Sequence, residues 1–149
     1  MVLVVLALAP ALLVQARPVV AADGAIGIVK TVTGACRIVR ADRQETALVG
    51  DALYRQDVIE TGADGALGLT LKDSSMLSLG ANSRFELAAF EFEPHARKLS
   101  LISRLMQGTL SFITGEICKL APDRVRVETP TAMIGVRGTR FVVRVGAAQ

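Results

Sequence analysis

The chain has 149 residues, a length that suits one domain better than two. Its 17 basic and 14 acidic residues nearly balance, so the formal charge of +3 gives no electrostatic argument for nucleic-acid binding. Tryptophan is absent and aromatic residues make up 4% of the chain, which also argues against base-stacking surfaces.

The first residues form an apolar leader. Residues 1–16 carry no charge, Arg17 and Pro18 end the run, and the small residues before Asp23 suit a signal peptidase. We therefore predict a signal peptide over residues 1–22, cleaved after Ala22, and an exported or periplasmic protein. The basic residues that usually open such a leader are missing, which indicates a start placed too late or an incomplete leader. An uncleaved membrane anchor is the alternative, although this run is shorter than the roughly 20 residues that span a bilayer.

The rest of the chain alternates short strand-like segments with turn residues, which is the pattern of an all-β domain. We place this single domain at residues 26–146. Residues 99–107 also fit helical spacing, but the strand-like segment after Gly108 favours a strand with a hairpin return. The predicted strands are residues 26–33, 35–40, 57–61, 66–72, 76–79, 84–92, 98–106, 109–114, 124–129, 132–137 and 139–146.

One motif near the C-terminus is more informative than any other segment. It follows a strand pattern, contains a proline and two glycines, and leads into a second strand with an aromatic residue at its start. The proline cannot donate to a strand ladder and so fits an edge or a turn, and the glycines predict a bend or a close approach of neighbouring backbone. The motif residues are Thr129, Pro130, Gly135, Val136, Arg137, Gly138, Thr139 and Phe141.

This motif resembles the C-terminal signature of the FecR domain family, a group of bacterial envelope domains. The family pattern is a strand, Thr-Pro, a short apolar stretch, Gly-Val-Arg-Gly-Thr and an aromatic-led strand, and this chain carries it over residues 127–141. Arg140 stands where the family often has an acid. The resemblance covers about residues 26–145 and implies a twisted β-sandwich or a solenoid-like FecR-type fold. Upstream, an Asp-Gly turn that is usual in the family reads Asp73-Ser74-Ser75 here.

The arginines of the C-terminal third suggest two kinds of role. We expect Arg137, between the two motif glycines, to hold backbone carbonyls or an acid such as Glu128 or Glu60, because its guanidinium offers five donors in a rigid fork. Recognition of a partner is the alternative role for Arg137. A basic strip for an acidic partner, an anionic polymer or lipid head groups would form if two C-terminal strands were neighbours; a solvated face that protects a sheet edge is the other interpretation. The strip residues are Arg124, Arg126, Arg140 and Arg144.

The two cysteines, Cys36 and Cys118, lie far apart in the sequence. Export to an oxidising compartment would permit a disulfide between them, which would close a long loop and contribute roughly 3–5 kcal/mol. The alternative is a pair of buried free thiols that pack as small apolar side chains. Sequence leaves both alternatives open.

No catalytic or metal-binding constellation is apparent. The single histidine, His95, lies in a polar turn without a nucleophile in a recognisable pattern, and the cysteines lack the close spacing of a zinc site. We expect no cofactor, no small-molecule substrate and no enzyme activity.

The resemblance implies a role in binding. Family members with a full layout are anti-sigma regulators, with a cytoplasmic sigma-binding segment, a membrane helix and this periplasmic domain, which receives a signal from an outer-membrane transporter. We expect this chain to supply only the outer module, as a protein-interaction or signal-sensing domain that binds another envelope protein. The alternative is a structural protein associated with the cell wall or its polysaccharide. Sequence does not indicate the oligomeric state.

Overall fold

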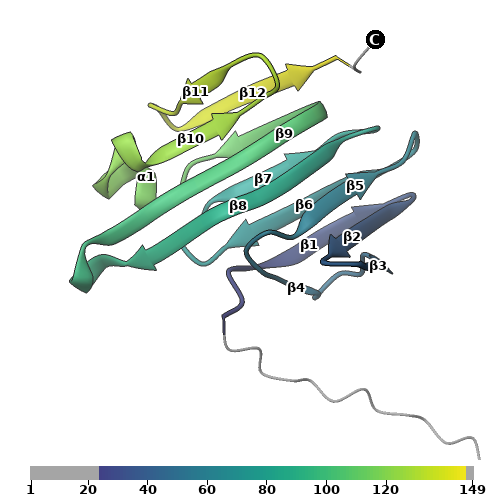
Figure 1. The fold of residues 1–149 in the computed structure, drawn as a ribbon, viewed down its shortest axis with the longest axis horizontal. Helices are drawn as coiled ribbons and strands as arrows, with labels where there is room; N and C mark the ends of the chain where they lie inside the picture. Colours follow the sequence, from purple (N-terminus) through teal and green to yellow (C-terminus); the bar gives the residue numbers. More distant parts are fainter. Residues whose placement is uncertain (1–23, 147–149) are drawn as a thin grey trace, which may run out of the picture.

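The computed structural model describes residues 24–146, so the predicted leader and its cleavage site lie outside the described residues. The described chain is mostly β-structure, which confirms the predicted fold class (Figure 1). Its elements are β1 (Gly27–Thr33), β2 (Cys36–Arg40), β3 (Arg43–Thr46), β4 (Ala52–Leu53), β5 (Val58–Thr61), β6 (Ala66–Leu71), β7 (Met76–Leu79), β8 (Arg84–Glu93), the 3-10 helix η1 (Pro94–Ala96), β9 (Lys98–Ile113), α1 (Glu116–Leu120), the 3-10 helix η2 (Pro122–Arg124), β10 (Val125–Glu128), β11 (Met133–Gly135) and β12 (Arg140–Val145).

The strands form two layers that share β9. Sheet A has the order β4–β1–β6–β7–β9–β12, and sheet B has the order β3–β2–β5–β8–β9–β10–β11. Neighbouring strands are antiparallel, with one parallel pair between β9 and β10. The result is a single curled sheet whose two halves face each other, with sheet B in front in Figure 1.

Strand β9 connects the two layers by changing which face it turns to the core. In its first half Leu101 and Leu105 point inward, whereas in its second half Leu110 and Phe112 do so. Odd-numbered residues face the core before Gly108 and even-numbered residues face it afterwards, and Gly108 itself has a φ of 94°. A side chain there would overlap with the backbone of Ser83, so only glycine fits. The predicted hairpin return after residue 106 is therefore wrong, because Gly108 lets one strand of 16 residues continue from sheet B into sheet A.

The core lies between the two sheets and consists mostly of leucine, isoleucine, valine and phenylalanine. Each fully buried side chain of this kind stabilises the fold by roughly 1.5–3 kcal/mol. Among the described residues, the Ser103 hydroxyl is the only buried side-chain oxygen or nitrogen without a hydrogen-bond partner. The largest fully buried side chains are Phe85, Phe112, Leu53, Ile59, Leu67, Leu69, Leu77, Leu79, Leu87, Leu101, Leu105 and Leu110.

A buried carboxylate connects β2, β4 and β5. The Asp57 side chain is 1% exposed and accepts from Arg40 Nε at 2.8 Å, from Arg40 Nη2 at 2.7 Å and from the Tyr54 backbone N–H at 2.8 Å. Arg40 also covers the Tyr54 ring at 4.5 Å from its centroid. The hydrogen bonds to Asp57, more than any other contact, raise the pKa of Arg40 and so favour its charged guanidinium beside the buried carboxylate.

Helix α1 was missed from the sequence because a distant residue defines its start. The buried Asp73 carboxylate accepts from the Ile117 backbone N–H at 3.3 Å, and the Asp73 carbonyl accepts from the Glu116 N–H at 2.7 Å. Ser75 Oγ donates to Asp73 at 2.8 Å and accepts from the Gly115 N–H at 3.0 Å. This turn therefore caps a five-residue helix that has no local signal of its own.

Two short strands were also missed. All four residues of β3 are exposed and polar, so they show no alternation, and β4 has only two residues. Within residues 24–146, no helix has both the length and the apolar character needed to cross a bilayer.

Candidate interaction surface at the C-terminal hairpin

The motif begins with a tight turn between β10 and β11. The Thr129 backbone N–H donates to the Ala132 carbonyl at 2.8 Å, and Thr129 Oγ1 accepts from the Ala132 N–H at 3.0 Å. Pro130 occupies the second position of this turn, where its fixed φ is favourable and no donor is needed. The predicted turn at Pro130 thus agrees with the structure.

The second part of the motif joins β11 to β12. Val136 is 4% exposed and packs into the core, and its N–H donates to the Val125 carbonyl at 3.2 Å. Gly138 has a φ of 128°, which turns the chain and which other residues rarely adopt. The Thr114 hydroxyl fixes this bend by donating to the Gly138 carbonyl at 2.8 Å. Gly135 differs from the prediction, since a Cβ there would meet no atom within 4 Å and no close approach requires it.

Strand β12 then packs back onto β9. The Thr139 carbonyl accepts from the Thr114 backbone N–H at 3.0 Å, which starts the pairing. The Phe141 ring stacks on Phe112 with centroids 5.1 Å apart and an angle of 21° between the planes. The end of the motif is therefore fixed to the core by an aromatic pair.

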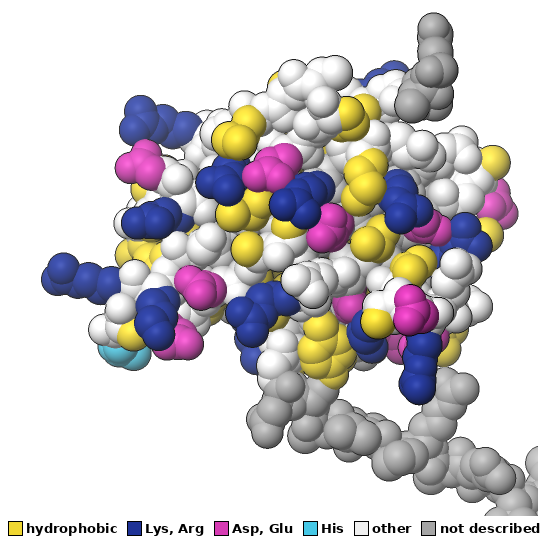
Figure 2. Space-filling view, in the orientation of Figure 1, with side chains coloured by type: hydrophobic (Ala, Val, Ile, Leu, Met, Phe, Trp, Pro, Cys, Tyr) yellow, Lys and Arg dark blue, Asp and Glu magenta, His cyan; other side chains and the backbone are white. Residues whose placement is uncertain are grey.

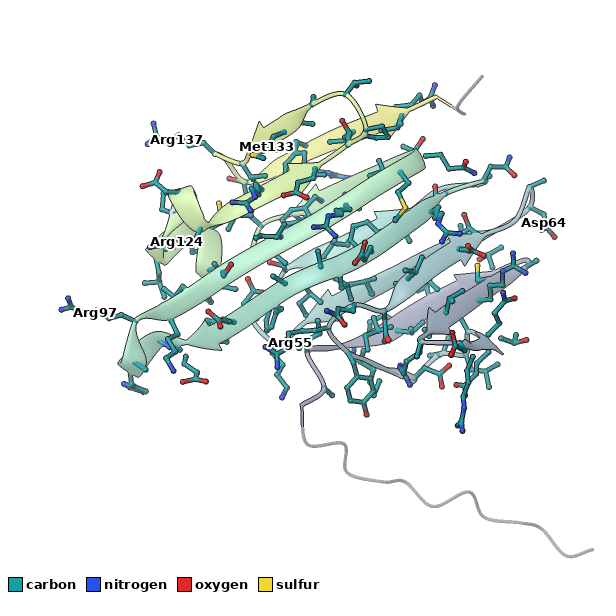
Figure 3. The ribbon with its side chains drawn as sticks, viewed as in Figure 1. Arg55, Asp64, Arg97, Arg124, Met133 and Arg137 are labelled. Atoms are coloured by element: carbon teal, nitrogen blue, oxygen red, sulfur yellow. The ribbon has the colours of Figure 1, made fainter. Side chains whose placement is uncertain are left out.

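Arg137 does not have the structural role that we expected. Its side chain is exposed and extends away from the body of the protein (Figure 3). Among the described residues it makes no hydrogen bond or ion pair, because both expected acids have other partners. Glu128 binds Arg104 and Arg126, and Glu60 binds arginines of β2 and β8. The expected contact of Arg137 with Glu128 or Glu60 is therefore wrong, and partner recognition remains as its alternative.

Ion pairs instead connect neighbouring strands across the outer face of sheet B. One row joins Arg37, Glu60 and Arg84, and Figure 2 shows basic and acidic side chains alternating over this face. In the second row Arg104 Nε donates to Glu128 at 2.8 Å and Nη1 reaches Glu86 at 3.4 Å. The hydrogen bond from Arg104 is the main cause of the lowered pKa of Glu128. This face is therefore largely neutralised by its own residues.

The predicted basic strip does not form as one surface. Arg126 points outward from sheet B, where it donates to Glu128 at 3.1 Å, and Arg124 ends helix η2 beside it. Arg140 and Arg144 point outward from sheet A, on the opposite side of the core from Arg126. The physical reason is that β10 and β12 pair with different halves of β9, so they are not neighbours in one sheet.

Of the two alternatives for Cys36 and Cys118, the structure shows no disulfide, since both thiols are buried and free. Cys36 Sγ contacts the Thr33 carbonyl at 3.4 Å, and Cys118 Sγ contacts the Val136 carbonyl at 3.7 Å. Burial raises the pKa of the Cys36 thiol, so it favours the neutral form. Both cysteines pack as small core residues, which is the alternative the sequence left open.

Two shallow grooves flank the C-terminal hairpin, which β10 and β11 form. The first, which we call the hairpin groove, has a volume of about 430 Å³. Met133 projects beside it with 66% of its surface exposed, close to Arg137 (Figure 3). The residues lining the hairpin groove are Pro122, Asp123, Val125, Arg126, Met133, Gly135, Val136 and Arg137.

The second, which we call the edge groove, has a volume of about 580 Å³ and lies between β11 and β12. Apolar side chains of β9, β11 and β12 form its floor. Its lining residues are Met106, Thr129, Pro130, Thr131, Ala132, Ile134, Val143, Arg144, Val145 and Gly146.

Sequence reasoning missed Met133 as a surface residue. It was included only as part of a short apolar stretch, yet Met133 and Gly135 alternate with Ile134 and the buried Val136. If Val136 is assigned to the core, strand alternation places Met133 on the outer face. The sequence also gave no sign of a groove, which depends on how two sheets end beside each other.

The described part of the chain offers no metal centre, since no three histidine, cysteine, aspartate or glutamate side chains are suitably grouped within residues 24–146. His95 is exposed in η1. The hairpin thus brings together an unpaired cation, an exposed thioether and two grooves.

Residues 57–149 match the model of the family described as FecR protein, which covers more than half of the chain. No curated protein matches, and neither does any solved structure.

Proposed function

Because the chain belongs to the FecR family, whose members are generally regulatory and non-enzymatic, we propose that it is an exported interaction module of the cell envelope. The family membership supports a role in signal sensing or signal transduction. On this proposal the periplasmic domain acts by binding another envelope protein and carries out no chemistry itself.

The observation that carries the proposal is the position of Arg137. It lies inside the family motif, yet it is exposed and makes no ion pair or hydrogen bond within the described chain. The structure explains the residue types on either side of it, because Val136 packs into the core and Gly138 makes the bend. A residue in such a motif without an internal contact is best explained by an external one, and arginine is among the side chains enriched at protein interfaces.

The surroundings of Arg137 support the same conclusion. Met133 beside it offers a flexible apolar contact of a kind that suits protein partners. The hairpin groove runs between these two side chains and η2. Since most arginines of the neighbouring sheet face are already paired, Arg137 is a cation that a partner's carboxylate could bind without breaking an existing ion pair.

The proposal is tested by comparing Arg137→Ala with Arg55→Ala in pull-downs from envelope extracts. Arg55 is a matched control because it is also exposed and unpaired in the described structure, but lies far from the hairpin (Figure 3). We expect a discrete partner that is retained by the wild type and by Arg55→Ala, and lost with Arg137→Ala at an unchanged melting temperature. Equal retention by both variants would contradict the assignment of this surface.

Two further experiments test the cell-wall alternative and the export of the protein. Sedimentation of the protein with purified peptidoglycan, together with the absence of a protein partner, would favour the cell-wall role. Fusion of residues 1–40 to a phosphatase that is active only after export tests the location, and an inactive fusion would contradict export.

A further inference from the structure

The two sheets have four edge strands among the described residues, and three of them are poor sites for adding another strand. Strand β3 has four exposed polar residues, β4 has two residues, and β11 has three residues directly after the Pro130 turn. Short length, polar composition and a nearby proline are the usual protections of a sheet edge.

Strand β12 lacks these three protections, and its only protection of this kind is the charge of the outward Arg140 and Arg144. It has six residues in an unbroken register with β9, contains no proline and has no bulge. Its inward side chains Phe141, Val143 and Val145 are apolar, and no charge points inward. Within residues 24–146 β12 pairs only with β9, so its other edge offers free backbone donors and acceptors.

The two layers also differ in width on this side of β9. Sheet B continues with β10 and β11, whereas sheet A continues with β12 alone. A strand added to β12 would therefore extend sheet A opposite β11. Its inward side chains would reach the edge groove, whose floor includes Ile134, Val143 and Val145.

The outward residues of β12 define the charge of the strand that fits. Arg140 and Arg144 are exposed and make no ion pair in the described structure, and Val142 between them is 64% exposed. Directly opposite residues on adjacent strands interact most strongly, and opposite charges there stabilise the pair. An acid, an apolar or threonine residue and a second acid, each two positions apart, would match these three residues.

We propose that the β12 edge binds an extended segment of a partner protein by strand addition, with apolar residues on one face and acids four positions apart on the other. This deepens the proposed function and rests on it, since it assigns the chemistry of a partner segment. Backbone hydrogen bonds hold the segment, the edge groove takes its apolar face, and the two arginines set its specificity.

A second copy of the chain fits this edge less well. Antiparallel pairing of two β12 strands centred on Val142, a register that keeps the apolar side chains of both copies on one face, would place Arg140 of one copy opposite Arg144 of the other. Like charges directly opposite each other destabilise a strand pair. The charge of the edge therefore favours a different, acidic segment.

The test uses the acetylated peptide Ser-Val-Glu-Val-Thr-Val-Glu-Ser, and a second peptide with lysine in place of both glutamates, in titrations against the full chain. We expect the wild type to bind the glutamate peptide at least tenfold more tightly than the lysine peptide. The double variant Arg140→Glu with Arg144→Glu should reverse this preference, whereas Arg97→Glu, in a distant exposed turn, should leave it unchanged.

Three results would overturn the proposal: no binding of the glutamate peptide, equal binding of both peptides, or dimerisation of the chain through β12 in sedimentation experiments. A glutamate peptide with N-methylated amides on alternate residues should bind at least tenfold more weakly, and undiminished binding would exclude strand addition. These outcomes are independent of Arg137, so loss of the peptide with retention of an Arg137-dependent partner would remove this inference and leave the proposed function in place.

Discussion

Three buried serines provide matched substitutions whose effects should differ in sign. Ser103 faces the core from β9 with its hydroxyl unpaired. Ser75 Oγ donates to the Asp73 carboxylate at 2.8 Å and accepts from the Gly115 N–H at 3.0 Å. Ser83 Oγ accepts from the Thr109 backbone N–H at 3.0 Å. Each is at most 2% exposed, so replacement by alanine removes the same atom from a similarly dry environment.

The magnitudes follow from what each hydroxyl contacts. An unpaired buried hydroxyl costs about 1–3 kcal/mol in desolvation, so Ser103→Ala should stabilise the protein by about 1 kcal/mol after a small loss of packing. Ser75→Ala removes a hydrogen bond to a charged group and leaves a buried N–H unpaired, which should destabilise by about 2–3 kcal/mol. Ser83→Ala removes neutral hydrogen bonds only and should destabilise by about 1–2 kcal/mol.

Urea unfolding followed by circular dichroism measures these differences, because the chain has no tryptophan for fluorescence. We expect the midpoint for Ser103→Ala to rise and the midpoints for Ser75→Ala and Ser83→Ala to fall, all at an unchanged slope. A lower midpoint for Ser103→Ala, or equal changes at all three positions, would refute the reasoning, since hydrogen bonding would then not distinguish these hydroxyls.

Two other substitutions test the framework of the fold. Gly108→Ala would force a side chain into a φ of 94° and onto the backbone of Ser83, so we expect the free energy of unfolding to fall by at least about 3 kcal/mol. An unchanged melting temperature would contradict the role of Gly108 in the path of β9. Arg40→Met leaves the buried Asp57 carboxylate with one backbone donor and should destabilise the protein by about 3 kcal/mol. Arg37→Met removes one arginine of an exposed ion pair and should change stability by less than about 1 kcal/mol. Equal effects of the two substitutions in urea titrations would contradict the importance of burial.

Alternation in the sequence was enough to locate most of the strands. Valine or leucine at every second position marked β6, β7 and β10, and these strands bury the expected side chains. Alternation fails where a strand is too short or wholly polar, as in β4 and β3. It also fails for α1, whose start depends on Asp73, more than 40 residues earlier.

The site was less predictable than the fold because contacts between strands are not local. The sequence correctly placed Arg126 and Arg140 on outward faces, but it could not show that these faces belong to different sheets. It likewise paired Arg137 with Glu128, although Arg104 on the neighbouring strand is directly opposite that acid. The exposure of Arg137 and the free edge of β12 became visible only from the arrangement of the strands.

The long strand β9 belongs to both layers, so the stability of one layer depends on that of the other. Neither layer can be completed until all 16 residues of β9 are in place, and its partners come from segments on both sides of it in the chain. Such long-range pairing predicts slow folding, on the scale of milliseconds to seconds, and a single cooperative transition for both layers. A load applied at β12 or at β10 would consequently reach the same strand, so the protein responds to a pull at either surface as one mechanical unit.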